Sequence, residues 1–321
     1  MTAALPDKST LPTGFTSRPA TLEDAEAITE QMGAVTAALI GYPKHSFDDV
    51  SNYLRDPKLE LATDSLLVFD GTELVGTSTV LPHVGTSLIN LDVFAADPAV
   101  AGWLLDRGIE RALEQAHGSS EVTISVGMDQ ADQLLPVLYA ERGFSRQTTI
   151  QRMQIDHSGP VQGPPVPAGV VVRRGALDDA TRRAAHQVIA TAFADQPSAV
   201  PRPYDDWLAS REARSTFDWM QLTLLEIDGR AVGYRECNDN FLKTDNCNYV
   251  GRLGVVPEAR GRGLAKYLLL DSFALDAAAG RSGTILHVDS SNPTPAVGLY
   301  LSVGMTPRMT SHIWHRTIPL T

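Results

Sequence analysis

The segment from Tyr249 to Lys266 reads YVGRLGVVPEARGRGLAK and contains the clearest structural signal in the chain. Its first half is an apolar stretch typical of a buried strand, which the proline at position 257 brings to an end. A basic, glycine-rich turn follows. From Leu264 to about Ala279 the sequence then predicts a mostly apolar helix that ends at Gly280.

The turn between this strand and this helix has the chemistry of a phosphate-binding site. Backbone N–H groups at a helix N-terminus point outward and the helix macrodipole adds positive potential, so an anion there gains several hydrogen bonds. Gly261 and Gly263 carry no side chain that would keep a diphosphate away. Formal charge comes from Arg260, Arg262 and Lys266. The alternative at this point is a solvated turn that binds nothing. Two other phosphate-binding motifs, GxxxxGK[ST] and GxGxxG, do not match this segment.

The composition excludes several classes of protein. A length of 321 residues suits two domains, and 43% hydrophobic with 20% charged residues is typical of a globular chain. No apolar run approaches the roughly 20 residues of a membrane span, and prolines and charges interrupt the first fifteen residues, where a signal peptide would be apolar. A net charge of −11 argues against a nucleic-acid partner. We therefore expect a cytoplasmic protein with neither a membrane nor a nucleic acid as its partner.

Charge is distributed unevenly between the two halves. Residues 1–157 hold 10 Lys and Arg against 22 Asp and Glu, whereas residues 158–321 hold 17 against 16. An anionic ligand would prefer the second half, and the acidity of the first half would attract a cationic amine or only confer solubility. Cys237 and Cys247 have no zinc-ligand pattern around them, so we expect no metal site and two reduced thiols.

A linker divides the chain. Residues 157–169, HSGPVQGPPVPAG, contain four prolines and three glycines, which prevent both helix and sheet from propagating. We therefore predict an N-terminal tail over residues 1–15, a first domain over residues 16–157, a linker over residues 158–169 and a second domain over residues 170–321.

The two halves repeat the same order of signals. In each half an Asp-Gly pair joins two apolar runs, at positions 70–71 and 228–229, and this pair is the strongest short hairpin signal. Each half then has a strand that ends at a proline, a helix, another strand and a Tyr. The distance from the proline to Tyr139 is 41 residues and the distance to Tyr300 is 43. We infer an internal duplication, in which each copy is an α/β unit around a mixed sheet.

With this context, the turn resembles the pattern Arg/Gln-x-x-Gly-x-Gly/Ala of the GCN5-related N-acetyltransferases, the GNAT superfamily. Here the pattern is Arg260-Gly-Arg-Gly263-Leu-Ala265. The resemblance covers the C-terminal half and, more faintly, the N-terminal half. The arrangement of the two halves is similar to that of the tandem-domain actinobacterial branch, which includes mycothiol synthase. It implies an α/β fold of two tandem GNAT-like domains, each a mixed central sheet flanked by helices. The mycothiol-synthesising members carry an acidic residue where this chain has Tyr249.

The resemblance also implies an activity and its cofactor-binding residues. The C-terminal domain would bind acetyl-CoA, or a related short acyl-CoA, as co-substrate and transfer the acyl group to a primary amine, with no metal. The strand would contact the pantetheine arm and the loop amides the diphosphate. The expected binding residues are Leu253, Gly254, Val255, Arg260, Gly261, Arg262, Gly263, Leu264, Ala265, Lys266 and Asn292. Tyr300 would donate a proton to the departing thiolate, and a core tyrosine is the alternative.

The reaction also needs a base, because a protonated amine has no lone pair. A carboxylate, or a water relayed to one, must first remove a proton. The candidates are Glu236 and Asp239 before the loop and Asp289 after it, and His287 is a weaker fourth. His287 and Asp289 are two residues apart on one expected strand, so both should point to the same face. Each candidate is also compatible with an ordinary residue near a strand end.

The N-terminal copy lacks the phosphate-binding chemistry. Residues 97–103 read DPAVAGW, with one glycine, no basic residue and an aspartate that would repel phosphate. We therefore do not expect acyl-CoA to bind there in the usual way, and we assign this half a supporting role, with Tyr139 as a packing residue. Two other functions stay open, an acyl-CoA or metabolite sensor without turnover and a protein-modifying acetyltransferase. The sequence does not determine the acceptor amine, the acyl group or the oligomeric state.

Overall fold

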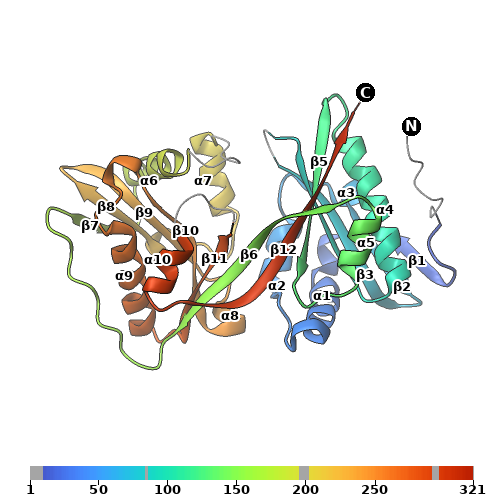
Figure 1. The fold of residues 1–321 in the computed structure, drawn as a ribbon, viewed down its shortest axis with the longest axis horizontal. Helices are drawn as coiled ribbons and strands as arrows, with labels where there is room; N and C mark the ends of the chain where they lie inside the picture. Colours follow the sequence, from blue (N-terminus) through green and yellow to red (C-terminus); the bar gives the residue numbers. More distant parts are fainter. Residues whose placement is uncertain (1–9, 84–85, 195–201, 291–295, 321) are drawn as a thin grey trace. The chain divides into compact units, whose positions relative to one another are not determined.

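The computed structural model describes residues 10–83, 86–194, 202–290 and 296–320. It divides into two compact units (Figure 1). Unit 1 consists of Met1–Thr149 together with Ser311–Thr321, and unit 2 of Ile150–Thr310. Each unit has a mixed sheet with helices packed against it, so the predicted α/β class with two tandem units is confirmed.

Unit 1 has the strand order β1-β2-β3-β4-β5-β12. Only β4 and β5 are parallel among its described pairs. The strands are β1 (Phe15–Arg18), β2 (Ser65–Asp70), β3 (Glu73–Pro82), β4 (Leu88–Ala95), β5 (Glu121–Asp129) and the end of β12 (Thr306–Pro319). The helices are α1 (Ala25–Ile40), α2 (Phe47–Leu54), α3 (Leu61–Asp64), α4 (Pro98–Gln115) and α5 (Leu135–Glu141), after a 3-10 turn at Leu22–Asp24.

Unit 2 has the strand order β6-β11-β10-β9-β8-β7. Here β10 and β11 are the parallel pair among the described strands. The strands are β6 (Ser145–Asp156), β7 (Val171–Arg174), β8 (Leu222–Ile227), β9 (Arg230–Asn238), β10 (Cys247–Val255) and β11 (Gly283–Asp289). The helices are α6 (Asp179–Ala192), α7 (Tyr204–Glu212), α8 (Leu242–Asp245), α9 (Leu264–Ala278) and α10 (Ala296–Ser302), with 3-10 turns at Trp219–Gln221 and Pro257–Ala259.

Both Asp-Gly pairs form the hairpins that the sequence predicts. In unit 2, Asp228 and Gly229 have φ angles of 51° and 76° between β8 and β9. Two consecutive residues in the left-handed region give the turn whose twist matches that of paired strands. In unit 1, Gly71 has a φ angle of 57° between β2 and β3. The local turn chemistry therefore determines where each hairpin folds back.

The last strand of each sequence half belongs to the other unit. Residues 150–156 of β6 pair with β11 of unit 2, whereas residues 311–319 of β12 pair with β5 of unit 1. The division into compact units therefore differs from the contiguous domains 16–157 and 170–321. The reason is that strand pairing depends on which edge is available, and a proline-rich segment marks only where regular structure stops.

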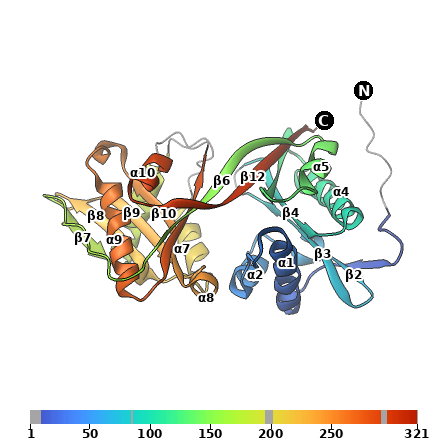
Figure 2. The same ribbon diagram turned by 60° about the horizontal axis from the view of Figure 1, so that its bottom comes forward.

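Helices cover both faces of the sheet in unit 1. A Cβ at Gly76 would contact Val100 and Leu104 of α4, so this face of β3 lies against α4. The next residue, Thr77, lies on the opposite face, because side chains alternate along a strand, and α1 and α2 lie on that side (Figure 2). The largest buried cluster of unit 1 lies between α4 and the sheet, and a second one lies beneath α1 and α2.

Candidate active site

Two parallel strands of unit 2 separate to form a cleft. β10 and β11 pair only over Cys247–Tyr249 and Gly283–Ile285 in the described register. Beyond these residues the cleft of about 630 Å³ is lined by residues 250–255 of β10, residues 286–289 of β11 and part of α10. The expected pantetheine-binding residues Leu253, Gly254 and Val255 all line it. The cleft therefore lies where the strands stop pairing.

The glycine-rich turn continues from the end of β10. Gly261 and Gly263 both have φ angles of 75°, a left-handed conformation that other residues adopt at a cost. A Cβ built on either glycine would meet no atom within 4 Å, so the space in front of the turn is open. Gly263 is the N-cap of α9, and no side chain caps this helix start in the described structure. The first amides of α9, from Leu264, Ala265 and Lys266, are therefore available to an external anion.

The corresponding helix start in unit 1 is already capped by its own chain. The Asp97 carboxylate accepts hydrogen bonds from the backbone N–H groups of Ala99 at 2.8 Å and Val100 at 3.0 Å. Pro98 takes the first helical position, where its missing N–H costs nothing. The negative charge that this helix N-terminus favours is thus supplied internally.

The basic residues of the turn differ in their surroundings. Arg260 donates from Nε to the Val255 carbonyl at 3.2 Å and from Nη2 to the Ala192 carbonyl at 2.9 Å. It therefore ties the turn to β10 and to the end of α6. Arg262 and Lys266 are exposed beside the helix start, where each adds positive potential.

The two equivalent tyrosines have different environments. Tyr300 on α10 lines the cleft of unit 2, and burial raises its pKa to about 12, so its phenol is protonated at neutral pH. Tyr139 on α5 is 1% exposed and donates its hydroxyl to the Gly127 carbonyl at 2.9 Å. This geometry agrees with the packing role expected for Tyr139.

Glu236 lies in a buried ion-pair cluster. It is 3% exposed, and its Oε2 accepts hydrogen bonds from Arg211 Nε at 3.0 Å and from the Tyr234 hydroxyl. Glu236 is not among the residues that line the cleft, although its Oε1 lies close to Gly251, which does. Asp239 is held elsewhere, since its Oδ1 accepts from Arg281 at 2.8 Å.

Two other sequence candidates, His287 and Asp289, line the cleft together. His287 Nδ1 lies 3.1 Å from the Tyr249 hydroxyl, and burial raises the pKa of Tyr249. Phe241 packs on both rings, with centroid distances of 5.3 Å to Tyr249 and 6.0 Å to His287. Asn292, expected to bind the cofactor, lies outside the described residues.

The sequence analysis missed Ala192 and Phe193, which form the wall of the cleft at the end of α6. A Cβ at Gly254 would lie 2.9 Å from the Phe193 ring and 3.0 Å from the Ala192 side chain. Gly254 is therefore required for α6 to approach β10 this closely. The isolated Gly254 in an apolar strand was the one signal of a close approach, but it did not identify the partner.

Two further features concern other kinds of site. Within the residues that the structure describes, no three His, Cys, Asp or Glu side chains come together as metal ligands. Both cysteines are buried thiols, as expected. No described helix is both long and apolar enough to cross a membrane.

Comparisons with known proteins agree with this geometry. Residues 184–305 match the family model described as "Acetyltransferase (GNAT) family". A mycothiol acetyltransferase of Frankia alni is 28% identical over 83% of this chain and 85% of its own length. Another, of Thermobispora bispora, is 32% identical over 78% of this chain and 82% of its own length. A GCN5-related N-acetyltransferase structure from Sphaerobacter thermophilus superposes with a TM-score of 0.82 at 23% identity and covers 97% of this chain and 98% of its own, a likeness of fold.

The family match spans the cleft and the glycine-rich turn, and the relatives extend over most of both units. Together they establish the expected co-substrate, acetyl-CoA, and the expected class of reaction. The chain belongs to the GNAT family and is an acetyl-CoA-dependent N-acetyltransferase.

Proposed function

We propose that this enzyme transfers an acetyl group from acetyl-CoA to the primary amine of a small molecule, and that unit 2 is the catalytic unit. The contrast between the two helix starts carries the proposal. α9 begins at Gly263 without a side-chain cap beside an open cleft, whereas Asp97 caps α4 in unit 1. Only the former leaves N–H groups for a diphosphate.

The residues of unit 2 fit acetyl-CoA, which supplies the acetyl thioester when bound. The amides from Gly261 to Lys266 would hold the diphosphate, because the left-handed glycines leave the space before them open. Leu253, Gly254 and Val255 would contact the pantetheine arm, since all three line the cleft. Arg260 supports the turn through its two carbonyl contacts, while Arg262 and Lys266 contribute charge.

A protonated amine loses two protons as the C–N bond forms and the C–S bond breaks: a base removes one before attack and passes it to solvent, and the second balances the proton that the leaving sulfur gains. We assign the second step to Tyr300, whose protonated phenol lies in the cleft. A phenol at this position donates a hydrogen bond to the charge that develops on the leaving sulfur.

We assign the first step to His287. His287 Nδ1 and the Tyr249 hydroxyl are 3.1 Å apart, and in the tautomer whose Nδ1–H donates to Tyr249 the other ring nitrogen, Nε2, has the lone pair that accepts a proton. Asp289, two residues further along the same strand, is the second candidate because it also lines the cleft. We assign Glu236 a positioning role instead, since it attaches α7 to β9 through Arg211.

The acceptor class follows from the relatives. Proteins named mycothiol acetyltransferase act on a small molecule, and they resemble this chain across both units. Tyr249 contacts His287, which lines the cleft, and Tyr249 stands at the position where the mycothiol-synthesising branch carries an acid. We therefore propose a small amine as the acceptor and place desacetyl mycothiol in the test panel rather than in the conclusion.

The first experiment tests the binding site. Gly263→Glu places a carboxylate at the start of α9, and calorimetry should show acetyl-CoA affinity reduced about 100-fold or more, since several charge-assisted hydrogen bonds are lost. Gly280→Glu is the matched control, because Gly280 has a φ angle of 73° and open space at the other end of the same helix. Equal affinities in the two variants would contradict the site.

The second experiment tests turnover. Release of free CoA from acetyl-CoA is measured with a panel of small amines and with lysine peptides. Tyr300→Phe and His287→Gln should each lower kcat about 100-fold with acetyl-CoA affinity unchanged. Binding without CoA release for any amine would favour a sensor, and turnover with peptides alone would show a protein-modifying enzyme.

A further inference from the structure

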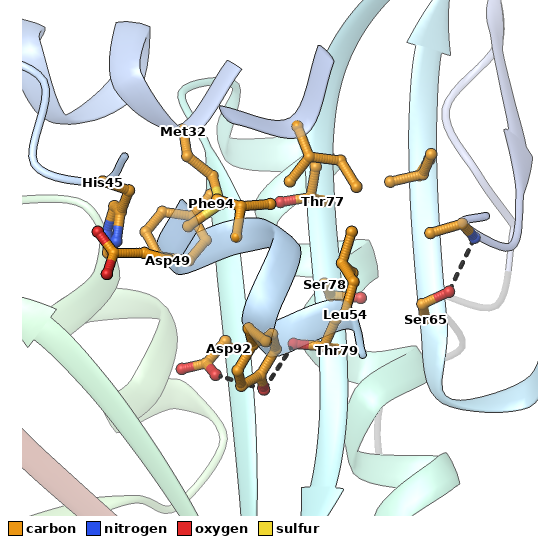
Figure 3. Close-up of a pocket in the computed structure, with 15 residues that line it drawn as sticks. Met32, His45, Asp49, Leu54, Ser65, Thr77, Ser78, Thr79, Asp92 and Phe94 are labelled. Atoms are coloured by element: carbon orange, nitrogen blue, oxygen red, sulfur yellow. Dashed lines mark hydrogen bonds between the residues drawn. The ribbon is translucent and has the colours of Figure 1, made fainter. Parts of the chain in front are cut away.

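Unit 1 contains a pocket of about 230 Å³ that the chemistry of unit 2 does not use. It lies between α1, α2 and the face of β2–β4 that these helices cover (Figure 3). Its walls are mostly apolar and include Ile28, Met32, Val50, Leu54, Leu67 and Phe94.

The strand register explains why unit 1 has this pocket. Gly76 pairs with Ala95 in unit 1, and Gly233 pairs with Val255 in unit 2, each directly after a bulge. Counting one residue on from each of these glycines, Thr77 corresponds to Tyr234. Tyr234 is 0% exposed and fills the core of unit 2 with its ring. Thr77 does not fill the corresponding volume from β3. Its pairing partner Phe94, which stands where unit 2 has Gly254 opposite Tyr234, lines the pocket that remains.

The same register shows that the polar end of the pocket differs in charge from its counterpart in unit 2, because among the described residues Asp92 has no paired cation on the facing strand. Asp92 pairs with Thr79, and the corresponding pair in unit 2 is Arg252 with Glu236. Oδ2 of Asp92 accepts the Tyr53 hydroxyl at 3.0 Å, and this hydroxyl lies 3.1 Å from the Thr79 hydroxyl. Among the described side chains, Tyr53 donates to Oδ2 and none donates to Oδ1 of Asp92. Asp92 and Thr79 lie at one end of the pocket, and Met32, His45 and Phe94 lie at the other (Figure 3).

Asp92 is the carboxylate at this end of the pocket, and Asp49 lies beside His45 at the other end (Figure 3). Burial raises the pKa of Asp92, and the charge of Lys44 acts in the opposite direction. Burial also lowers the pKa of His45 to about 4, so this ring is neutral at pH 7 and packs on Phe94. Asp49 accepts from the backbone N–H and the hydroxyl of Ser46 at the start of α2. A carboxylate at the end of an apolar pocket favours a cation with a hydrocarbon body.

We propose that unit 1 binds a small organic cation, an amine carried on a compact hydrocarbon or aromatic group, with its ammonium at Asp92. This site is separate from the acetyl-transfer cleft, so unit 1 is a ligand-binding unit in its own right. The proposal does not depend on which amine unit 2 acetylates.

The test uses the full chain with ¹³C-methyl methionine, because Met32 lines the pocket and reports on its occupancy. The Met32 resonance is assigned with Met32→Leu and then titrated with 2-phenylethylamine and with its neutral counterpart, 2-phenylethanol. We expect the amine to shift the resonance saturably and to bind about tenfold or more tightly than the alcohol, because the alcohol can donate to the carboxylate but has no positive charge to pair with it. No shift with the amine at about 10 mM, a concentration that would detect even weak binding, would overturn the proposal.

Two substitutions locate the ligand. Thr77→Tyr copies unit 2 and should abolish the shift, whereas Thr77→Val keeps the space and should retain it. Asp92→Asn should remove the preference for the amine over the alcohol without excluding either. If Thr77→Tyr does not fold, as judged by circular dichroism and CoA release, Asp92→Asn decides. Equal binding of amine and alcohol in the unmodified chain, or an unchanged preference in Asp92→Asn, refutes the cation site.

Discussion

Variants of the buried ion pair between Arg211 and Glu236 distinguish a structural role of Glu236 from a catalytic one. Arg211 is 8% exposed and Glu236 is 3% exposed. The Arg211 guanidinium also donates to the Ser210 hydroxyl at 3.2 Å and lies 4.5 Å from the centre of the Trp207 ring. Arg211→Met keeps an unbranched apolar chain about as long as the aliphatic stem of Arg, and it removes the guanidinium that contacts Trp207 and neutralises Glu236.

The expected loss of stability follows from this burial. Removing one partner of a buried ion pair costs about 3 to 5 kcal/mol, because the remaining charge has no compensation. We expect about 3 kcal/mol here, since the Tyr234 hydroxyl still donates to Glu236 and Met recovers apolar contact. With an m value of about 2 kcal/mol/M in urea, the midpoint should fall by about 1.5 M. The double variant Arg211→Met with Glu236→Gln should recover part of this loss, because no charge is left buried.

Urea unfolding followed by tryptophan fluorescence measures these changes, and the kcat of each variant is measured in parallel. In our assignment Glu236→Gln lowers the free energy of unfolding and leaves the pH–rate profile in place. The reasoning is refuted if Glu236→Gln retains full stability but loses kcat by about 100-fold, since Glu236 would then be the base. It is also refuted if the double variant is as unstable as Arg211→Met alone.

Two further predictions concern unit 1. Burial lowers the pKa of His45 to about 4 from 6.5, so between these pH values the unfolded chain binds a proton that the folded chain does not. The free energy of unfolding should therefore fall by about 3 kcal/mol as the pH drops from 6.5 to 4. His45→Gln should remove this pH dependence in urea titrations at several pH values, and an unchanged dependence would contradict the assignment. Asp97→Ala should lower the free energy of unfolding by about 1 kcal/mol, because the N-cap of α4 is lost, and Asp97→Asn should lower it by less. Equal thermal midpoints for the unmodified chain and both variants would show that the cap does not stabilise the protein.

The sequence was most informative where the determining residues lie close together in the chain. Asp228 and Gly229 specify a hairpin by their own backbone preferences. Gly261 and Gly263 likewise mark a turn that few other residues can form, and it opens α9 where the pattern predicted. The duplication was visible for the same reason, because both copies repeat such local signals at similar spacing.

The tertiary structure decided what depends on residues far apart. Which edge accepts the last strand of each half follows from pairing between β6 and β11 and between β12 and β5. The partner of Glu236 is Arg211, 25 residues away, and the partner of His287 is Tyr249, 38 residues away. Whether a carboxylate is exposed to the cleft or neutralised in the core depends on such contacts. Similarly, Thr77 lines a pocket because the elements packed around it leave space there, which no property of a single residue can reveal.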